Sequence, residues 1–202
     1  MKFIYGTGNK AKVQQVADFF KSINKPIEII SLKDIGFSEE IEENGSTFEE
    51  NSMIKAKAIK AFCGKKGINE IIVTDDTGLC VDSLNGDPGI YSARYAGDHA
   101  SQEESIKKLL SNMENIEEEK RTAKFVCVLT AIMPDGKIIV TRGETKGKIA
   151  KAPGPLGKLT YGPIFIPEGF NKVMNELTDK ELGTTHRQKA FMELIKKMQE
   201  QI

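Results

Sequence analysis

The chain has 202 residues, which is long enough to bury one sizeable hydrophobic core. Its 29 Lys and Arg residues are balanced by 29 Asp and Glu residues, so there is no long-range positive field to gather nucleic acid or an anionic membrane surface. We therefore expect no nucleic-acid partner and no membrane partner, and any polyanion that binds must be small and held locally.

The three cysteines favour a reducing compartment. Cys63, Cys80 and Cys127 are odd in number, widely spaced and placed in apolar stretches, which fits reduced thiols better than disulfides or a zinc cluster. The apolar run of residues 3–5 is far shorter than that of a signal peptide, and residues 126–133 are too few to span a bilayer. We expect a cytoplasmic protein.

A strand, a glycine turn and a helix open the chain. Residues 3–5 are typical of a buried strand, and the Gly-Thr-Gly-Asn sequence of residues 6–9 predicts a turn, because glycine allows the backbone angles that a turn needs. Apolar residues then recur at helical spacing, at Val13, Val16, Ala17 and Phe20.

A second strand and a second helix follow. Residues 27–30 predict the strand, and an acidic loop over residues 34–45 leads to the helix. Ser46 with Glu49 three residues later has the spacing of a capping box, so the helix is expected over about residues 47–63.

An acidic motif interrupts the next extended segment. The β-branched run of residues 71–73 stops at an Asp-Asp-Thr-Gly sequence, and residues 79–84 continue as a further extended piece before a glycine-rich turn. Asp75 and Asp76 are therefore expected at the end of a strand.

The second half of the chain predicts a helix, a hairpin and a loop. The helix is expected over about residues 102–113, and the extended segments 122–133 and 137–149 flank a Pro-Asp-Gly turn, which favours an antiparallel hairpin. Residues 152–169 are rich in proline and glycine, a composition typical of an ordered binding loop.

The last predicted helix is capped by Thr184 or Thr185 and carries His186 and Arg187 in its first turn. Its apolar residues again recur at helical spacing: Phe191, Leu194, Ile195 and Met198. Together these elements predict an α/β fold with a mixed β-sheet, in one domain over residues 1–202.

The turn before the first helix has the features of an anion site. A helix that begins directly after a glycine turn directs unpaired backbone N–H groups outward, which suits a phosphate. Lys12 lies about one turn into the helix, and Thr7 and Asn9 add short polar side chains. The alternative is an ordinary strand-to-helix connection with solvated lysines. Neither the P-loop pattern nor G-x-G-x-x-G is present.

Asp75 and Asp76 are candidates for a metal site. Adjacent strand residues point to opposite faces, so the two carboxylates should have different roles. Mg²⁺ is commonly held by one or two carboxylates together with substrate phosphates, and the acidic residues 39–43 supply further carboxylates. Such a site suits phosphoanhydride hydrolysis. The alternative makes residues 76–78 a turn and the glutamates a solvated loop.

Three basic side chains complete the set of candidates. Lys55 on the second helix could neutralise phosphate charge, and His186 with Arg187 could bind a ligand through the helix terminus and the guanidinium group. The alternatives are a surface lysine for the first, and a helix cap with a surface charge for the pair.

Taken together, these motifs resemble the family of non-standard purine nucleoside triphosphate pyrophosphatases, the Ham1 or inosine triphosphatase family. The resemblance covers nearly the whole chain and depends on residues 7–12, 43–55, 75–79, 87–94 and 185–187. It implies homodimers of an elongated, bilobed α/β domain with a twisted mixed sheet flanked by helices. It also implies Mg²⁺-dependent cleavage between the α- and β-phosphates, which releases a nucleoside monophosphate and pyrophosphate.

The resemblance implies roles position by position. The residues that would contact the nucleotide are Thr7, Gly8, Asn9, Lys12, Lys55, Thr77, Leu159, Thr160, Tyr161, Gly162, His186 and Arg187. The first four and Lys55 would hold the triphosphate, and His186 with Arg187 would meet the base. Glu43 and Asp76 would bind Mg²⁺, with Glu42 as an alternative to Glu43. Asp76 would also accept the proton of the attacking water.

The segment that would meet the base departs from the family pattern. The family usually has Phe-Gly-Tyr/Trp-Asp-Pro where residues 159–163 are Leu-Thr-Tyr-Gly-Pro. Leu159 has no aromatic ring to stack on a purine, and Gly162 has no carboxylate to pair with the base edge. Glu181 replaces a lysine of the family, with Lys180 beside it. We expect the hydrolytic half to be retained and the base preference to have diverged.

Two other functions remain open. One is a non-catalytic nucleotide-binding relative, favoured by these departures. The other is a phosphotransferase with a nucleophilic aspartate of the dehalogenase type, although that motif needs an Asp-x-Asp spacing that Asp75 and Asp76 do not supply.

Overall fold

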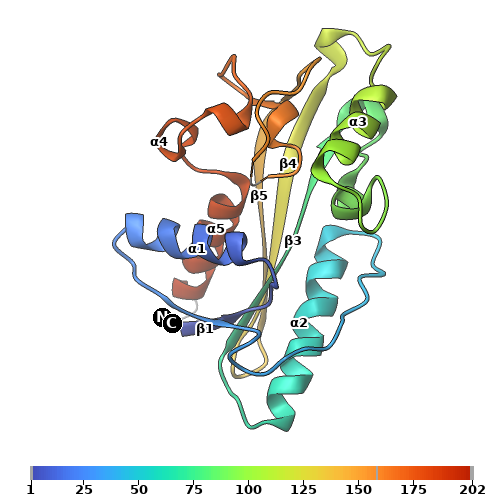
Figure 1. Cartoon of the computed structure of the whole chain (residues 1–202). Coiled ribbons are helices and arrows are strands. Elements are labelled where there is room, and N and C mark those ends of the chain that lie inside the picture. The colour runs from blue at the N-terminus through green and yellow to red at the C-terminus, as the bar shows by residue number, and fades with distance from the viewer. Residues whose placement is uncertain (1, 158, 201–202) are drawn as a thin grey trace. The chain divides into compact units, whose positions relative to one another are not determined.

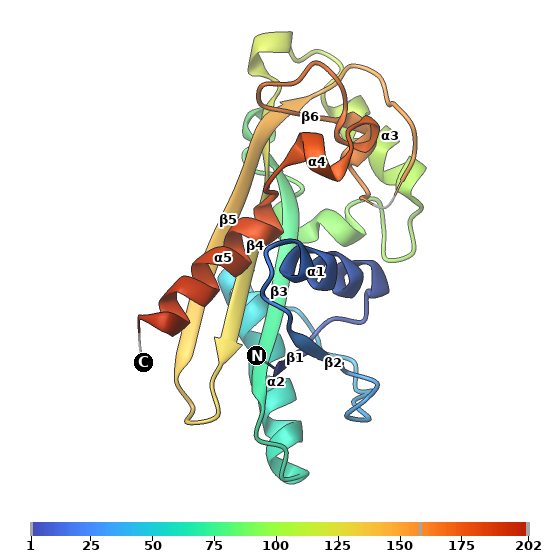
Figure 2. The same cartoon turned by 90° about the vertical axis from the view of Figure 1, so that its left-hand side faces the viewer.

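A computed structural model describes residues 2–157 and 159–200 of the chain (Figures 1 and 2). The strands are β1 (Lys2–Tyr5), β2 (Glu28–Ser31), β3 (Ile71–Val81), β4 (Thr122–Ile132), β5 (Ile138–Ile149) and β6 (Phe165–Pro167). The helices are α1 (Lys10–Ser22), α2 (Phe48–Lys65), α3 (Gln102–Asn112), α4 (Asp179–Leu182) and α5 (His186–Gln199).

The strands form one mixed sheet in the order β2-β1-β3-β4-β5-β6. β1 pairs in parallel with both β2 and β3, and β5 pairs antiparallel with β6. A tight turn joins β4 to β5, with Met133 N–H donating to the Lys137 carbonyl at 2.8 Å. The predicted α/β class with a mixed sheet is confirmed, and so is the predicted hairpin.

The chain divides into two compact units, one from the described parts of residues 1–76, 127–143 and 187–202, the other from residues 77–126 and 144–186. Three strands, β3, β4 and β5, contribute residues to both units. The single domain over residues 1–202 stays a prediction.

The first unit has an apolar layer on each face of its strands, because successive side chains of a strand point to opposite faces. Tyr5 and Val73 pack with apolar residues of α1 and α5, whereas Ile4 and Ile72 pack with apolar residues of α2. Figure 1 shows α1 and α5 on one side of β3 and α2 on the other. In this unit, β3 side chains on one face therefore meet α1 and α5, and those on the other face meet α2.

The second unit is built around a separate apolar cluster. Leu79 of β3, Leu109 of α3, Phe125 of β4 and Phe165 of β6 are buried in it, and the rings of Phe125 and Phe165 meet edge to face with centroids 4.8 Å apart. Its helix α3 begins at a capping box, in which Ser101 and Glu104 satisfy each other's backbone N–H groups.

β3 differs from the strand that the sequence predicts. Instead of stopping at the acids and resuming at Leu79, it runs unbroken over Ile71–Val81, so Asp75 and Asp76 lie in its middle rather than at its end. The Asp-Asp-Thr-Gly sequence has low strand propensity, but pairing within the sheet overrides that preference. The alternative in which residues 76–78 form a turn is wrong.

Two further boundaries also differ. The N-cap of α2 is Thr47, whose hydroxyl accepts from Glu50 N–H at 3.1 Å, and not Ser46 paired with Glu49. The Thr47–Glu50 pair has the same spacing one residue later, so sequence spacing alone did not separate them. The proline-rich segment expected to be a loop contains the short strand β6.

The three cysteines are thiols rather than disulfides, as predicted, although Cys80 is only half-buried. Across the part of the chain that the structure describes, no helix is both long enough and apolar enough to cross a membrane.

Candidate active site

The turn between β1 and α1 is shaped by packing at Gly6 and by capping at Asn9. A Cβ atom on Gly6 would lie 2.5 Å from Ile59 Cδ1 and 2.6 Å from Thr74 Cγ2, so the chain can pass here only as glycine. Asn9 Oδ1 caps α1 by accepting from the N–H groups of Ala11 at 2.9 Å and Lys12 at 3.3 Å. Two of the backbone N–H groups that we expected to bind an anion are therefore already hydrogen-bonded to Asn9.

The other turn residues lie at the surface. Gly8 and Asn9 are exposed, and Thr7 is half-buried with its hydroxyl accepting from Asn9 N–H at 3.2 Å. A Cβ on Gly8 would meet no heavy atom within 4 Å, so this glycine leaves open space beside the turn.

Asp75 is buried on the face of β3 that carries α1 and α5, and cations surround it. Its carboxylate accepts from Lys12 Nζ at 2.8 Å, from Tyr5 Oη at 3.0 Å and from Arg187 Nη2 at 3.5 Å. Burial alone would raise the pKa of Asp75, but Lys12 and Arg187 outweigh it and hold this pKa well below its usual range. Asp75 therefore favours its charged form and pairs with two cations.

Asp76 faces the opposite side of β3, toward α2. Asn51 Nδ2 donates to its Oδ2 at 3.2 Å, and Lys55 Nζ lies 3.8 Å from its Oδ1. Burial raises the pKa of Asp76, Lys55 opposes this shift, and the nearby Glu43 carboxylate adds to it, so the net pKa is raised. The prediction that the two adjacent acids differ in role agrees with these two environments.

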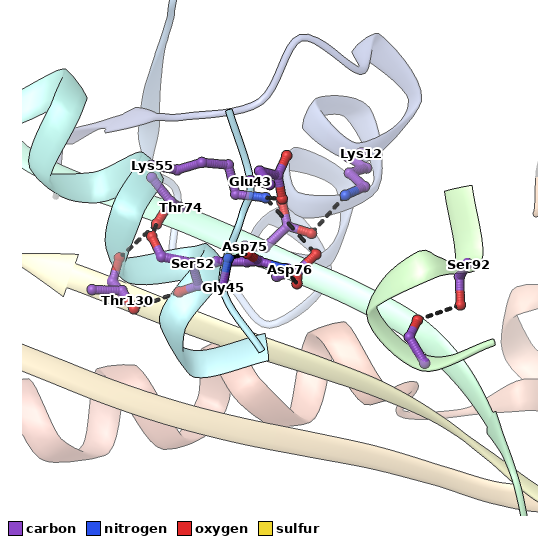
Figure 3. Close-up of polar contacts among 12 residues, drawn as sticks. Lys12, Glu43, Gly45, Ser52, Lys55, Thr74, Asp75, Asp76, Ser92 and Thr130 are labelled. Atoms are coloured by element: carbon purple, nitrogen blue, oxygen red, sulfur yellow. Dashed lines mark hydrogen bonds and ion pairs between the residues drawn. The ribbon is translucent and has the colours of Figure 1, made fainter. Parts of the chain in front are cut away.

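Lys55 joins the acidic loop to Asp76 (Figure 3). Its Nζ donates to Glu43 Oε2 at 2.6 Å while it lies near Asp76, and its side chain is only 13% exposed. The interpretation of Lys55 as a simple surface lysine is therefore wrong. Glu42 is exposed, whereas Glu43 is half-buried against Lys55, which favours Glu43 as the partner of Asp76.

Asn51 is a member of this cluster that the sequence analysis did not select. It is 1% exposed, and its Oδ1 accepts from Gly45 N–H at 2.9 Å while its Nδ2 donates to Asp76. A Cβ on Gly45 would lie 2.8 Å from that Oδ1, so the acidic loop approaches the helix only because residue 45 is glycine. The signal in the sequence was the four-residue spacing of Asn51 and Lys55, which places both on one helix face.

Glu43 and Asp76 are the residues that could hold a metal ion. Their carboxylates both lie near one cation, the Lys55 ammonium group, and carboxylate oxygens are the ligand type that Mg²⁺ prefers. Among residues 2–157 and 159–200, no group of three or more His, Cys, Asp or Glu side chains could hold a metal. A magnesium ion would therefore take its remaining oxygens from water and substrate phosphate.

Arg187 is buried in the first unit, where it contacts α1 and β3. It is 4% exposed, and besides Asp75 it donates from Nη1 to Gln15 Oε1 of α1 at 2.8 Å. As predicted, it occupies the first turn of α5, but it is a buried group rather than a surface charge.

In the second unit, the segment predicted to meet the base is held by its backbone. Gln102 Nε2 of α3 donates to the carbonyls of Leu159 at 2.6 Å and Thr160 at 3.1 Å. Tyr161 is 2% exposed, and its hydroxyl donates to the Ser92 carbonyl at 3.1 Å. Leu159 is half-buried against the apolar cluster of this unit.

Two of the three departures from the family pattern, Gly162 and Glu181, make specific contacts within the second unit. A Cβ on Gly162 would overlap Asn175 Oδ1, so the Asn175 carboxamide fills the space into which a side chain at position 162 would project. Glu181 accepts from Thr178 N–H and from Thr178 Oγ1, both at 2.8 Å, and so closes the capping box of α4. Both substitutions therefore belong to packing and capping contacts within the second unit.

His186 and Thr77 are the remaining predicted residues in this unit. His186 is 2% exposed and stacks on the ring of Phe125, with centroids 5.1 Å apart and planes 14° from parallel. Thr77 is half-buried in β3, directly after Asp76.

The chain is similar to known proteins over nearly its full length. The model of the Ham1 family matches residues 3–197. The dITP/XTP pyrophosphatase of Bacillus subtilis is 41% identical over 196 residues, covering 96% of this chain and 94% of the relative, and that of Clostridium perfringens is 39% identical over 195 residues, covering 96% and 95%. The solved Ham1 protein of Staphylococcus aureus superposes with a TM-score of 0.83 at 33% identity, covering all of both chains, and that of Coxiella burnetii with 0.84 at 28%, covering 99% of each. The chain therefore belongs to the Ham1 family.

Proposed function

We propose that the chain hydrolyses non-standard purine nucleoside triphosphates, such as ITP, dITP and XTP, to the nucleoside monophosphate and pyrophosphate. The proposal rests on one observation: the carboxylates of Glu43 and Asp76 lie 2.6 and 3.8 Å from the same cation, the Lys55 ammonium group. The naming of its relatives as dITP/XTP pyrophosphatases supports the same activity.

Phosphate binding falls to the turn over residues 7–12 and to Lys55. Lys12 supplies a compact positive charge, and the exposed Gly8 leaves room for phosphate oxygens to approach the backbone. Arg187 supplies a second cation beside Asp75. Contacts to the base are proposed for residues 159–162, His186 and Arg187, with Thr77 against the substrate.

Asp76 is the proposed general base, and Glu43 with Asp76 would hold Mg²⁺. When bound, Mg²⁺ makes a water easier to deprotonate and neutralises phosphate charge. The water oxygen bonds to the α-phosphorus, its proton passes to an Asp76 oxygen, and the bond from the α-phosphorus to the bridging oxygen breaks to release pyrophosphate. A raised pKa suits Asp76 to accepting this proton, and Asn51 orients its carboxylate.

The test measures pyrophosphate release from ITP, dITP and XTP beside ATP and GTP, with Mg²⁺ or with EDTA. We expect Mg²⁺-dependent release of pyrophosphate and monophosphate in equal amounts. Asp76→Asn should lower kcat by roughly 10²–10⁴-fold with the circular dichroism spectrum unchanged, since it keeps the shape and removes the base. Release of orthophosphate, or near-normal turnover by Asp76→Asn, would contradict the proposal.

A relaxed base preference is the second candidate within this activity. The contact that favours it is at Gly162, where the Asn175 carboxamide fills the space of a side chain. An enzyme that uses ATP or GTP nearly as well as ITP would support this candidate, whereas strong preference for ITP and XTP would exclude it.

The proposal extends to assembly and compartment. We infer a single-domain homodimer in the cytoplasm, by resemblance to the family and because the three cysteines are thiols rather than disulfides. Light scattering on the eluting protein tests the dimer, and a mass of one chain would exclude it.

A further inference from the structure

Lys55 lies where the proposed function needs a metal ion. Its ammonium group is 2.6 Å from Glu43 Oε2 and 3.8 Å from Asp76 Oδ1, the same two carboxylates proposed as metal ligands. All three side chains are partly buried, with exposed fractions of 13%, 30% and 11% for Lys55, Glu43 and Asp76. Charges in such a place are screened less than charges in water.

The charges do not allow Lys55 to stay in this position when a metal binds. With Lys55 between them, the two carboxylates and one ammonium sum to one negative charge. A divalent cation at the same oxygens would stand within a few Å of the ammonium group, and the two positive charges would repel each other. Lys55 can leave without disturbing α2, because its charge is at the end of a flexible four-carbon chain.

The rest of the cluster is fixed independently of Lys55. Asn51 holds the other oxygen of Asp76, Oδ2, and also binds the backbone of the acidic loop at Gly45. Departure of the ammonium group therefore leaves these contacts of Asp76 and the loop in place, and it breaks the hydrogen bond from Lys55 to Glu43.

We propose that the Lys55 ammonium is a built-in counter-cation that holds Glu43 and Asp76 together before metal binds and competes with the metal for them. Metal loading displaces it, and the displaced ammonium is then available to substrate phosphate. This inference rests on the proposed function, because that function supplies the metal ligands.

The two possible roles of Lys55, competitor of the metal or simple phosphate contact, predict different metal affinities for a variant without this lysine. If Lys55 only contacted phosphate, its removal would leave metal affinity unchanged in the absence of nucleotide. If it competes, Lys55→Met removes the competitor, so we expect Mn²⁺ to bind roughly tenfold more tightly without nucleotide. Binding is measured by the loss of the free Mn²⁺ signal in electron paramagnetic resonance. The melting temperature of the metal-free variant should fall, and its rise on adding Mg²⁺ should exceed that of the wild type.

Three variants serve as controls. Lys57→Met, at an exposed position of the same helix, should bind Mn²⁺ as the wild type does. Lys55→Arg keeps the charge and should retain wild-type affinity, and Lys55→Gln repeats the test if Lys55→Met does not fold. Equal or weaker Mn²⁺ binding by the folded neutral variants would overturn the inference.

The two proposals can fail separately. Mn²⁺ binding is measured without substrate. If Lys55→Met binds Mn²⁺ more tightly but the wild type hydrolyses no triphosphate, only the proposed function is contradicted. If the wild type hydrolyses triphosphates but Lys55→Met shows no gain in Mn²⁺ affinity, only the counter-cation proposal is contradicted.

Discussion

Asp76 has a different neighbour at each of its two carboxylate oxygens. Asn51 donates to Oδ2 at 3.2 Å, while Lys55 lies 3.8 Å from Oδ1. The orientation of the Asn51 amide is itself fixed, because its own oxygen accepts from Gly45 N–H. A neutral amide therefore sets the rotation of the proposed base, and the side that faces Lys55 is left for chemistry.

This arrangement predicts the effect of Asn51→Asp. The new carboxylate keeps an acceptor for Gly45 N–H but replaces the donor facing Asp76 with a negatively charged oxygen. We expect kcat to fall roughly 10–100-fold, as for other groups that orient a metal ligand, with a smaller change in KM. Steady-state kinetics with ITP measures both constants.

The control is Asn112→Asp, which changes the same side chain at an exposed bond to Tyr95 Oη. It should leave both constants unchanged. A fall in melting temperature of Asn51→Asp without any loss of kcat would show that Asn51 serves only the fold.

The sequence singles out the charged residues of this cluster, but it does not predict which of them contact one another. Lys12, Lys55, Asp75 and Asp76 stand in recognisable motifs. The partners of the two acids depend on which helix covers which face of β3. Asp75 pairs with two cations, whereas Asp76 contacts Asn51 and Lys55. Strand alternation predicts that the two acids diverge but not which acid meets which helix. Asn51 lies inside residues 43–55, one of the stretches that resemble the family. Only its burial and its two hydrogen bonds, to Gly45 and Asp76, show that it positions Asp76.

At the scale of elements, β3 shows where local rules fail. Short-range propensity breaks the strand at Asp75, whereas the structure continues it to Val81, beyond its pairing with β1 at Ile71–Val73, with β4 as its other neighbour in the sheet. Helices were predicted more accurately: α1 and α5 include the expected apolar residues, and α3 ends one residue before the expected end, since an amphipathic stripe is a signal carried within each helix.

Gly6 gives a prediction at this scale. The approach of β1 to α2 leaves no room for a methyl group between Ile59 and Thr74, so Gly6→Ala should lower the free energy of unfolding by about 1–3 kcal/mol through overpacking. Urea unfolding followed by circular dichroism at 222 nm suits a chain without tryptophan.

Gly64→Ala is the matched control near the end of α2, where a Cβ would meet no heavy atom within 4 Å. It should be neutral or stabilising, because alanine favours a helix. Equal stabilities of the Gly6→Ala variant and the wild type would mean that the contact relaxes without cost.

At the scale of the whole molecule, the balanced total charge includes a dense local cluster of opposite charges. The net charge is zero, yet the first unit gathers Lys12, Lys55 and Arg187 around Asp75 and Asp76. The α/β class and the mixed sheet could be predicted from the order of elements. The division into two units does not follow from the order of elements, because each unit is assembled from separated stretches of the chain. Only the resemblance to the family implied two lobes.

The two adjacent acids make opposite contributions to the pH dependence of stability. The folded pKa of Asp75 is lowered, so its contribution is fully present above the unfolded value of about 3.9 and is lost as pH falls below it. The folded pKa of Asp76 is raised by burial, so the native state binds the extra proton and stability falls as pH rises from about 3.9 through the folded pKa.

Melting temperatures between pH 3 and 6 in EDTA test this opposition. Relative to the wild type, Asp75→Asn should gain less stability as pH rises, and Asp76→Asn should gain more. A difference of about 3 °C in that gain corresponds to roughly 1 kcal/mol for a chain of this size. The comparison uses the change with pH, so a constant loss from leaving Lys12 and Arg187 without the Asp75 charge does not obscure it. Parallel curves for the two variants would mean that the acids share one environment, which their separate partners across β3 argue against.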